Sequence, residues 1–303
     1  MDLKSPLPRF QQRRQIGREG GHSQERELLE IIIGLISSTV IAWFAHRRGA
    51  LSASGAWAAI LVGTMTFGFG EWTWGLVLIA FFALSTLLSR YRQVDKRELA
   101  EKFAKGARRD MGQVLANGGL GAFIALLYFF YPRSPLLAAF LGSMATVNAD
   151  TWATEVGVLS RDPPRLITTG RRVPPGTSGG MTALGTTASA LGALVMGVLA
   201  YVLMYVEAVL SGDSALQLSW IVPITLFSGF LGSLFDSLLG ATVQGIFYCA
   251  KCEVDTEKEL HGCGLRTSHV RGWRWLNNDM VNFFSSLWGA LVAIALWGVI
   301  VTR

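Results

Sequence analysis

The segment NADTWATEVG (148–157) places two acids, an amide and two hydroxyl side chains inside an apolar stretch of the chain. A carboxylate at the centre of a membrane costs about 2.5–3.5 kcal/mol on insertion scales, so one that is present there usually serves a function. The next stretch carries Arg161, Arg165, Arg171 and Arg172 and ends in the glycine-rich turn PPGTSGG (174–180). Acids beside arginines and glycines predict a site for a metal ion and phosphate groups at the membrane surface.

Asp150 and Asp236 are the preferred ligands for this metal. Mg²⁺ takes carboxylate oxygens and usually shares its shell with water and substrate phosphates. The alternative for Asp150 is an ion pair with a loop arginine that only stabilises the fold. Asp150 and Glu155 point in roughly opposite directions on an ideal helix, whereas Asn148 and Thr151 share the face of Glu155. Either the helix is interrupted near Asp150, or the two acids have separate roles.

The stretch RRVPPGTSGGMTALGT (171–186) combines arginines, prolines and glycines before an apolar segment. Glycines let backbone N–H groups approach an anion, and the N-terminus of the following helix favours negative charge. The stretch does not match the Walker A pattern. Its alternative is a tight turn in which Thr177 or Ser178 caps the next helix. The predicted phosphate-binding residues are Asn148, Thr151, Arg171, Arg172, Gly176, Thr177, Ser178, Gly179 and Gly180.

Three further stripes of polar or small residues follow helical spacing. They comprise Asp110, Gln113, Asn117 and Gly121; Asn278, Asn282, Ser285 and Gly289; and Gly229, Gly232, Asp236 and Gly240. A single stripe is best explained by hydrogen bonding and close packing between helices. Three stripes that open on the same membrane side favour a shared polar cavity.

The three cysteines of the chain fall within CAKCEVDTEKELHGCG (249–264). Cys249, Cys252, His261 and Cys263 have the types and spacing of a tetrahedral zinc site. Four protein ligands leave no open coordination position, so such an ion would be structural. The alternative is a set of incidental thiols, because cytoplasmic placement argues against disulfides.

The elements that must hold these residues are transmembrane helices. Hydrophobic residues make up 51% of the chain and charged residues 16%, which is unlike a soluble domain. Windows long enough to cross about 30 Å of hydrocarbon recur along the chain, at 28–45, 51–69, 72–89, 111–131, 135–159, 181–209, 219–248 and 280–301. We expect an all-α polytopic bundle of seven or eight membrane segments. Residues 1–27 are polar and basic and predict a disordered tail, followed by one transmembrane domain (28–303) that includes a cytoplasmic Cys/His loop (249–270).

Loop charge predicts the orientation of the bundle. The segments 90–109, 160–172 and 251–274 are basic, which places them together in the cytoplasm. We expect an integral protein of a bacterial inner membrane, or its equivalent, with the site at the cytoplasmic side. Eight full spans would place the basic tail outside, whereas a segment 51–69 that enters and returns would place it inside. The net charge of +6 reflects this topology and does not indicate nucleic acid.

Taken together, these motifs resemble the membrane family called domain of unknown function 92, which includes plant phytyl-phosphate kinases of tocopherol synthesis. The resemblance runs from about residue 30 to the end. The residues that carry it are SGAWAAILVG (54–63), RRDMGQVLANG (108–118), NADTWATEVG, VPPGTSGGMTALGT, GSLFDSLLGATVQ (232–244) and the Cys/His loop. In this chain Gly262 separates His261 from Cys263, whereas the family pattern is expected to have them adjacent.

The resemblance implies transfer of the γ-phosphate of CTP, or of another nucleoside triphosphate, to an isoprenoid monophosphate. It implies Mg²⁺ at Asp150 and Asp236, with Glu155 and Asp279 as groups that support these ligands or bind a second metal ion, and Arg109 as a further catalytic group. The residues facing the acceptor would be Arg108, Arg109, Asp110, Gln113, Asn117, Asn278 and Asn282. A homodimer is one arrangement that the sequence allows.

Two other functions compete with this prediction. A CTP-dependent lipid-alcohol kinase or cytidylyltransferase would use the same site on a different acceptor. A lipid transporter or scramblase would line a pathway with its polar stripes and would carry polar groups at both membrane faces. The acids and glycines of this chain cluster toward the predicted cytoplasmic ends, which favours an enzyme.

Overall fold

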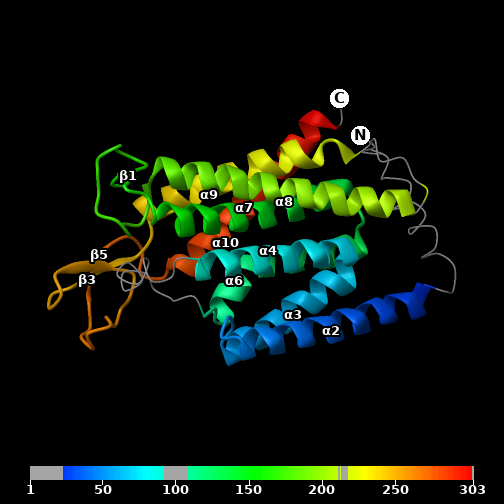
Figure 1. Ribbon diagram of the computed structural model, residues 1–303, viewed down its shortest axis with the longest axis horizontal. Helices are drawn as coiled ribbons and strands as arrows, with labels where there is room; N and C mark the ends of the chain where they lie inside the picture. The colour runs from blue at the N-terminus through cyan, green and yellow to red at the C-terminus, as the bar shows by residue number, and fades with distance from the viewer. Residues whose placement is uncertain (1–22, 92–107, 211, 213–217, 302–303) are drawn as a thin grey trace.

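The computed structural model describes residues 23–91, 108–210, 212 and 218–301, which form a bundle of long helices with small strands at one end (Figure 1). The described residues contain eight long helices: α2 (Ser23–Arg47), α3 (Ala53–Gly70), α4 (Trp72–Arg90), α6 (Met111–Phe130), α7 (Ser134–Gly157), α8 (Ala183–Leu210), α9 (Ile221–Thr242) and α10 (Asn278–Ile300). Seven of them are long and apolar enough to cross a membrane. Helix α7 is the one of the eight that is not among these seven. The chain is therefore a polytopic helical membrane protein, as its composition predicts.

Helix α7 lies at the centre of the bundle because small residues on its neighbours let it approach them closely. All residues from Leu137 to Ala149 are buried. A Cβ added to Gly142 would lie 2.6 Å from the Cβ of Ala293 on α10, and one added to Gly229 of α9 would lie 2.7 Å from the Cβ of Ala145. Gly229, which belongs to one of the predicted stripes, thus serves close packing, as small residues do between membrane helices.

Helices α2, α3, α4 and α6 form a second group beside this core (Figure 1). Helix α3 is continuous from Ala53 to Gly70 and is long and apolar enough to cross a membrane, so the alternative in which 51–69 enters and returns is wrong. As a result, α2 begins at the end of the bundle away from the strands. Helix α2 starts at Ser23, so residues 23–27 of the predicted tail are helical, and residues 1–22 lie outside the described residues.

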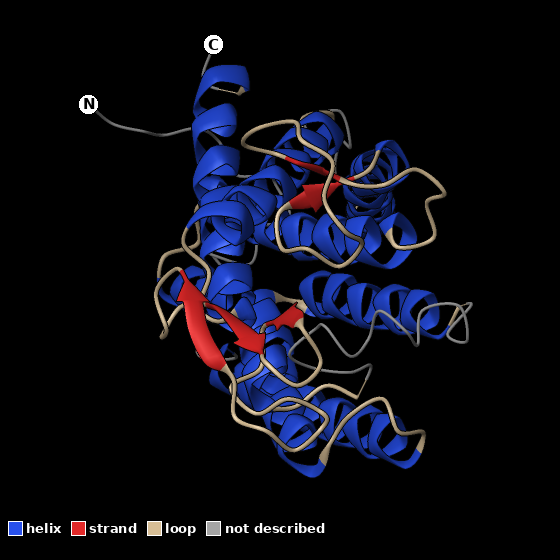
Figure 2. Ribbon diagram, turned by 90° about the vertical axis from the view of Figure 1, so that its left-hand side faces the viewer, coloured by secondary structure: helices blue, strands red, loops and turns tan. Residues whose placement is uncertain are grey.

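The strands gather at one end of the helices, here called the capped end (Figures 1 and 2). Strands β1 (Arg165–Leu166) and β2 (Gly180–Met181) pair antiparallel. Strand β3 (Ile246–Cys249) is the centre of a three-stranded antiparallel sheet with β4 (Val254–Thr256) and β5 (Ser268–Arg271). The predicted window 219–248 and the predicted Cys/His loop therefore include strands.

Helix α9 ends before β3 because its last carbonyls are capped from the sheet. The Arg271 guanidinium donates to the carbonyls of Gly240, at 3.1 Å, and of Ala241. A basic side chain at these carbonyls satisfies groups that the helix leaves unpaired. The capped end is thus joined directly to the helix that carries Asp236.

Candidate functional site

Asp150 of α7 and Asp236 of α9 meet at the capped half of the bundle. Their side chains are in hydrogen-bonding contact, and Ser285 of α10 donates to Asp236 Oδ2 at 3.0 Å. Both acids are partly exposed. Two carboxyl groups in contact require a shared proton or a cation between them, because two bare negative charges repel. The structure therefore brings the two predicted ligands together from separate helices.

Glu257, which follows β4, adds a third acid to this cluster. Its charge acts on Asp236. Its Oε1 accepts hydrogen bonds from Ser178 of the glycine-rich turn, at 2.9 Å, and from Gln244 beyond the end of α9, at 2.8 Å. Glu257 thus links the sheet, the turn and α9. Spacing in the sequence does not reveal it, since Glu257 lies 21 residues beyond Asp236 in a charged loop.

The glycine-rich turn packs on the C-terminal end of α9. Gly176 and Gly179 have φ angles of 82° and 81°, a region that favours glycine. A Cβ on Gly179 would also lie 2.5 Å from the backbone nitrogen of Ala241. The capping alternative for Thr177 and Ser178 is wrong: Thr182 Oγ1 accepts from Gly185 N at 3.0 Å at the start of α8. Thr177 Oγ1 donates to Pro174 O at 2.7 Å instead.

The remaining residues assigned to phosphate lie in different places. Arg171 and Arg172 are exposed beside the turn, and Gly180 begins β2. Thr151 Oγ1 donates to Val147 O at 2.7 Å within α7. Asn148 is fully buried, and its amide donates to Gly192 O of α8 at 2.8 Å, so it joins two helices.

Glu155 forms a second cluster on another side of α7. Ser89 of α4 donates to Glu155 Oε1 at 2.5 Å, and the charge of Glu155 acts on Arg109. Burial lowers the pKa of the Arg109 guanidinium to about 10, and the Glu155 carboxylate opposes this shift. Arg109 therefore remains a cation near neutral pH. Helix α7 is uninterrupted from Ser134 to Gly157, so the two acids of α7 have separate surroundings and the interrupted-helix alternative is wrong.

Arg109 also lines an apolar cavity between α2, α3, α4 and α6. The cavity volume is about 80 Å³, and its polar lining includes Gln113 and Asn117 beside apolar side chains such as Leu78 and Val62. The backbone of Arg109 is held by the α2–α3 connection: its N–H donates to Ala50 O at 3.0 Å, and its carbonyl accepts from Ser52 N at 2.9 Å. The cavity thus combines a fixed cation with hydrocarbon-like walls.

The other residues predicted to face the acceptor lie at helix starts. Asp110 is the N-cap of α6 and forms a capping box with Gln113, which explains their spacing. Arg108 is exposed, and its Nε donates to Leu51 O at 3.2 Å. Asn278 and Asp279 open α10. The carbonyl of Asn282 accepts from Ser285 Oγ at 3.0 Å, which places Asn282 one turn from the Asp236 contact.

A pair of acids not assigned from the sequence lies toward the opposite end of the bundle. Glu71, between α3 and α4, and Glu207, near the end of α8, are 8% and 5% exposed. The Trp72 indole N–H donates to Glu207 Oε1 at 3.1 Å. The sequence does not mark these acids as neighbours, because Glu71 lies between two apolar windows and Glu207 lies near the end of another, far along the chain.

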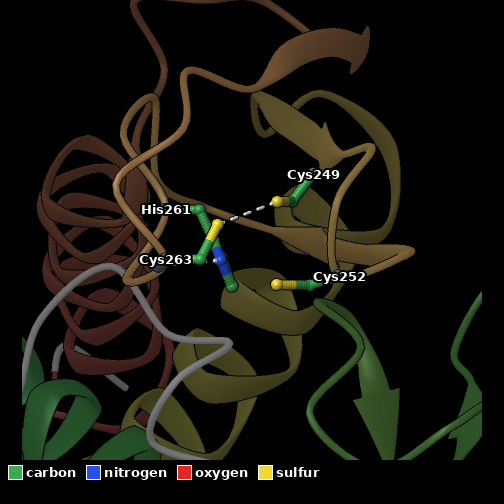
Figure 3. A group of neighbouring side chains, drawn as sticks. All are labelled: Cys249, Cys252, His261 and Cys263. Atoms are coloured by element: carbon green, nitrogen blue, oxygen red, sulfur yellow. Dashed lines mark hydrogen bonds between the residues drawn. The ribbon is translucent and has the colours of Figure 1, made fainter.

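The four predicted zinc ligands converge within the capped end (Figure 3). Cys249, Cys252, His261 and Cys263 each offer a ligand atom, and these atoms all lie within 4.8 Å of one another. In the part of the chain that the structure describes, this is the one group of three or more such donors that close together. The carboxylate oxygens of Asp150, Asp236 and Glu257 are therefore not all as close to one another as these four donor atoms.

Comparisons with known proteins agree with this architecture. The family model described as "Integral membrane protein DUF92" matches residues 36–290. The chain is similar to Protein PGR of Arabidopsis thaliana, with 31% identity over 271 residues that cover 85% of this chain and 92% of the relative. It is 27% identical to an uncharacterized membrane protein of Methanocaldococcus jannaschii, over 89% of this chain and 95% of the relative. It is 26% identical to Protein VTE6, chloroplastic, of Arabidopsis thaliana, over 81% of this chain and 65% of the relative. No solved structure matches.

Proposed function

Because the chain belongs to the integral membrane protein family DUF92, we propose that it is a membrane-embedded isoprenoid monophosphate kinase. It would transfer the γ-phosphate of CTP, or of another nucleoside triphosphate, to phytyl phosphate or a related prenyl phosphate. The observation that carries the proposal is the contact between Asp150 and Asp236 inside the helical bundle. The resemblance to phytyl-phosphate kinases supplies the substrate class.

The donor set around Asp150 fits Mg²⁺. Asp150 and Asp236 offer carboxylate oxygens in contact with each other, and Glu257 adds negative charge nearby. Mg²⁺ is usually held by one or two carboxylates together with water and substrate phosphates, so a site with two protein ligands is sufficient. When bound there, the ion would neutralise charge on the phosphate groups.

The protein's own residues would position the two substrates. Backbone N–H groups of the glycine-rich turn, with the exposed Arg171 and Arg172, would bind the triphosphate beside α9. An oxygen of the acceptor phosphate would attack the γ-phosphorus. The bond from that phosphorus to the β–γ bridging oxygen would break, and CDP would leave. A phosphate acceptor is already an anion, so the site needs positioning and charge neutralisation more than a strong base.

Arg109 and its cavity would bind the acceptor. The Arg109 cation would pair with the monophosphate, and the apolar walls would contact the first part of the isoprenoid chain. A cavity of about 80 Å³ holds only part of a long chain, so the remainder would lie against lipid-facing helix surfaces.

The two clusters lie on different sides of α7. Asp150 and Glu155 are five residues apart, which corresponds to about 7.5 Å along an α-helix and a rotation of about 140°. The acceptor phosphate at Arg109 and the nucleotide at Asp150 would therefore have to meet around the capped end of α7, which ends at Gly157. This arrangement would place the acceptor phosphate at the membrane surface, where a soluble nucleotide can approach.

The transporter alternative requires polar groups that continue from one membrane face to the other. Buried acids do lie toward the opposite end, at Glu71 and Glu207. However, a layer of buried aromatic rings lies within one helical turn of Glu71: Trp74 stacks on Phe140 with ring centroids 4.3 Å apart and contacts Tyr128 at 4.8 Å. All three rings are buried. This layer favours an enzyme over a pathway for polar headgroups.

The decisive experiment uses the purified chain in detergent with Mg²⁺, γ-labelled CTP or ATP, and phytyl or geranylgeranyl monophosphate. We expect labelled isoprenyl diphosphate and release of the nucleoside diphosphate. A cytidylyltransferase would instead release pyrophosphate, and a lipid-alcohol kinase would act on the free alcohol. Folded protein that yields no diphosphate from either nucleotide would refute the proposal.

A further inference from the structure

The cluster of Cys249, Cys252, His261 and Cys263 brings together two separate parts of the capped end (Figure 3). Cys249 is the last residue of β3, and Cys252 lies in the turn toward β4. His261 and Cys263 lie in the loop between β4 and β5. Cys249 is fully buried and His261 is 6% exposed, whereas Cys252 is exposed. The four side chains thus converge from two loops at the same end of the sheet.

The geometry of the cluster matches tetrahedral zinc coordination. A Zn–S distance of about 2.3 Å places two thiolates of a tetrahedron about 3.8 Å apart. The sulfurs of Cys249 and Cys263 are 3.6 Å apart. A disulfide requires about 2.05 Å between sulfurs, so this separation is that of two ligands and not of a bond. Two of the donors are buried where a metal would be shielded from water.

Gly262, the residue between His261 and Cys263, does not disturb this arrangement. A Cβ added to Gly262 would meet no atom within 4 Å. The additional residue therefore bulges into open space, and both neighbouring side chains still reach the cluster. The departure from the expected family spacing is accommodated locally.

The sheet is also too small to be stable through a core of its own. Its strands contain four, three and four residues. Apolar side chains around it are exposed, including Leu260 at 60% and Val270 at 59%. Small units of this kind usually need a disulfide or a structural metal to fold stably. A zinc ion would supply that link, because metal binding contributes directly to folding.

We infer that Cys249, Cys252, His261 and Cys263 bind one structural Zn²⁺ that joins the β3–β4 turn to the loop after Glu257. The ion fixes this loop only four residues from Glu257, whose carboxylate accepts from Ser178 and Gln244. The zinc site thereby holds the glycine-rich turn and the end of α9 in register. This second role rests on the proposed function, whereas zinc binding itself does not.

Metal content tests the site directly. The protein is purified in detergent without chelator, and zinc is measured by mass spectrometry. We expect about one zinc per chain, and after Co²⁺ exchange the thiolate-to-cobalt absorption of a tetrahedral site. Variant C252S should release its zinc at a chelator concentration at least about tenfold lower than wild type does. Replacing residues that only support metal ligands already costs about 10–100-fold in metal affinity.

The matched control is H269Q. His269 lies in β5 of the same sheet, but its ring contacts Phe247 outside the cluster. This variant should retain zinc as wild type does. Folded wild-type protein without zinc and without cobalt–thiolate absorption would overturn the inference, as would full zinc retention in C252S. Fewer than three free thiols in the unfolded, metal-free protein would reveal a disulfide and overturn it as well.

A second measurement covers the case in which C252S does not fold. Wild-type protein is treated with chelator, and trypsin cleavage after Lys258 and Arg266 is followed before and after zinc is restored. We expect the chelated protein to be cleaved faster and restored zinc to return protection; cleavage that does not respond to zinc would contradict the inference.

One variant and one treated form separate the zinc site from the proposed function. D236N should retain zinc but lose kinase activity, whereas wild type stripped of zinc by the chelator and then returned to Mg²⁺ should lose both zinc and activity. If zinc binds as expected and no form has kinase activity, the proposed function fails and the zinc site stands. If activity is present and unchanged after zinc is removed, the positioning role of the ion is wrong.

Discussion

Replacing Asp236 with asparagine should stabilise the metal-free protein while it abolishes turnover. Asp236 contacts Asp150 inside the bundle and accepts from Ser285. At an effective dielectric constant of about 20, two unit charges about 4 Å apart repel by about 4 kcal/mol. A proton shared between the carboxyl groups relieves much of this repulsion. We therefore expect D236N to gain about 1–2 kcal/mol in free energy of unfolding when no divalent cation is present.

Asparagine suits this test because it keeps the hydrogen bonds and removes one charge. Its carbonyl oxygen can still accept from Ser285, and its amide can donate to Asp150. The variant therefore changes the electrostatics of the cluster without opening a cavity. We expect the activity to disappear, because the variant removes one of the two carboxylates proposed to hold Mg²⁺ beside the substrate phosphates.

The assay is thermal unfolding in detergent, with EDTA or with Mg²⁺. In EDTA, a gain of about 1–2 kcal/mol would raise the melting temperature by about 2–8 °C in a domain of about 150–250 residues, and by somewhat less in this longer chain. In Mg²⁺, wild type should gain about 2.7 kcal/mol at a concentration about 100 times the dissociation constant, and D236N should gain much less. The control D162N removes an exposed loop acid and should behave as wild type in both buffers.

Two results would refute the reasoning. The repulsion argument is wrong if D236N melts below wild type in EDTA although its fold is intact by circular dichroism. The metal assignment is wrong if Mg²⁺ stabilises D236N as much as wild type, or if the variant retains near-normal turnover.

Two further predictions concern the glycine-rich turn and the acceptor cavity. Gly179 and Gly170 both have positive φ angles, of 81° and 67°, but only at Gly179 would an added Cβ meet backbone atoms, those of Ala241. G179A should therefore lower the melting temperature and the turnover more than the control G170A. Equal effects of the two variants would show that the close approach to Ala241 does not matter. R109Q should raise the KM for the isoprenoid phosphate by about tenfold or more, as expected for a lost charged hydrogen bond of about 1.5–3 kcal/mol. R108Q, at an exposed position, should leave the KM nearly unchanged, and the reverse order would reassign the acceptor phosphate to Arg108.

Composition and apolar periodicity alone were enough to predict the membrane bundle. The predicted windows agree with the helices within a few residues at most ends; for example, 111–131 corresponds to Met111–Phe130 and 280–301 to Asn278–Ile300. This succeeds because a helix that crosses hydrocarbon must be long, apolar and internally hydrogen-bonded. The residue types of the Cys/His cluster were also visible, since zinc ligands are few and their spacing is local.

Tertiary structure alone decided which polar residues act together. The sequence shows Asp150, Asn148 and Glu155 in one segment, yet they contact α9, α8 and α4 respectively. Helical spacing assigns residues to faces but does not specify the neighbouring helix on each face. Glu257 joined the site only through the folding of the sheet, because its partners Ser178 and Gln244 come from other segments of the chain. Local pattern therefore determined the helices and the donor types, while long-range packing of small residues determined which donors meet.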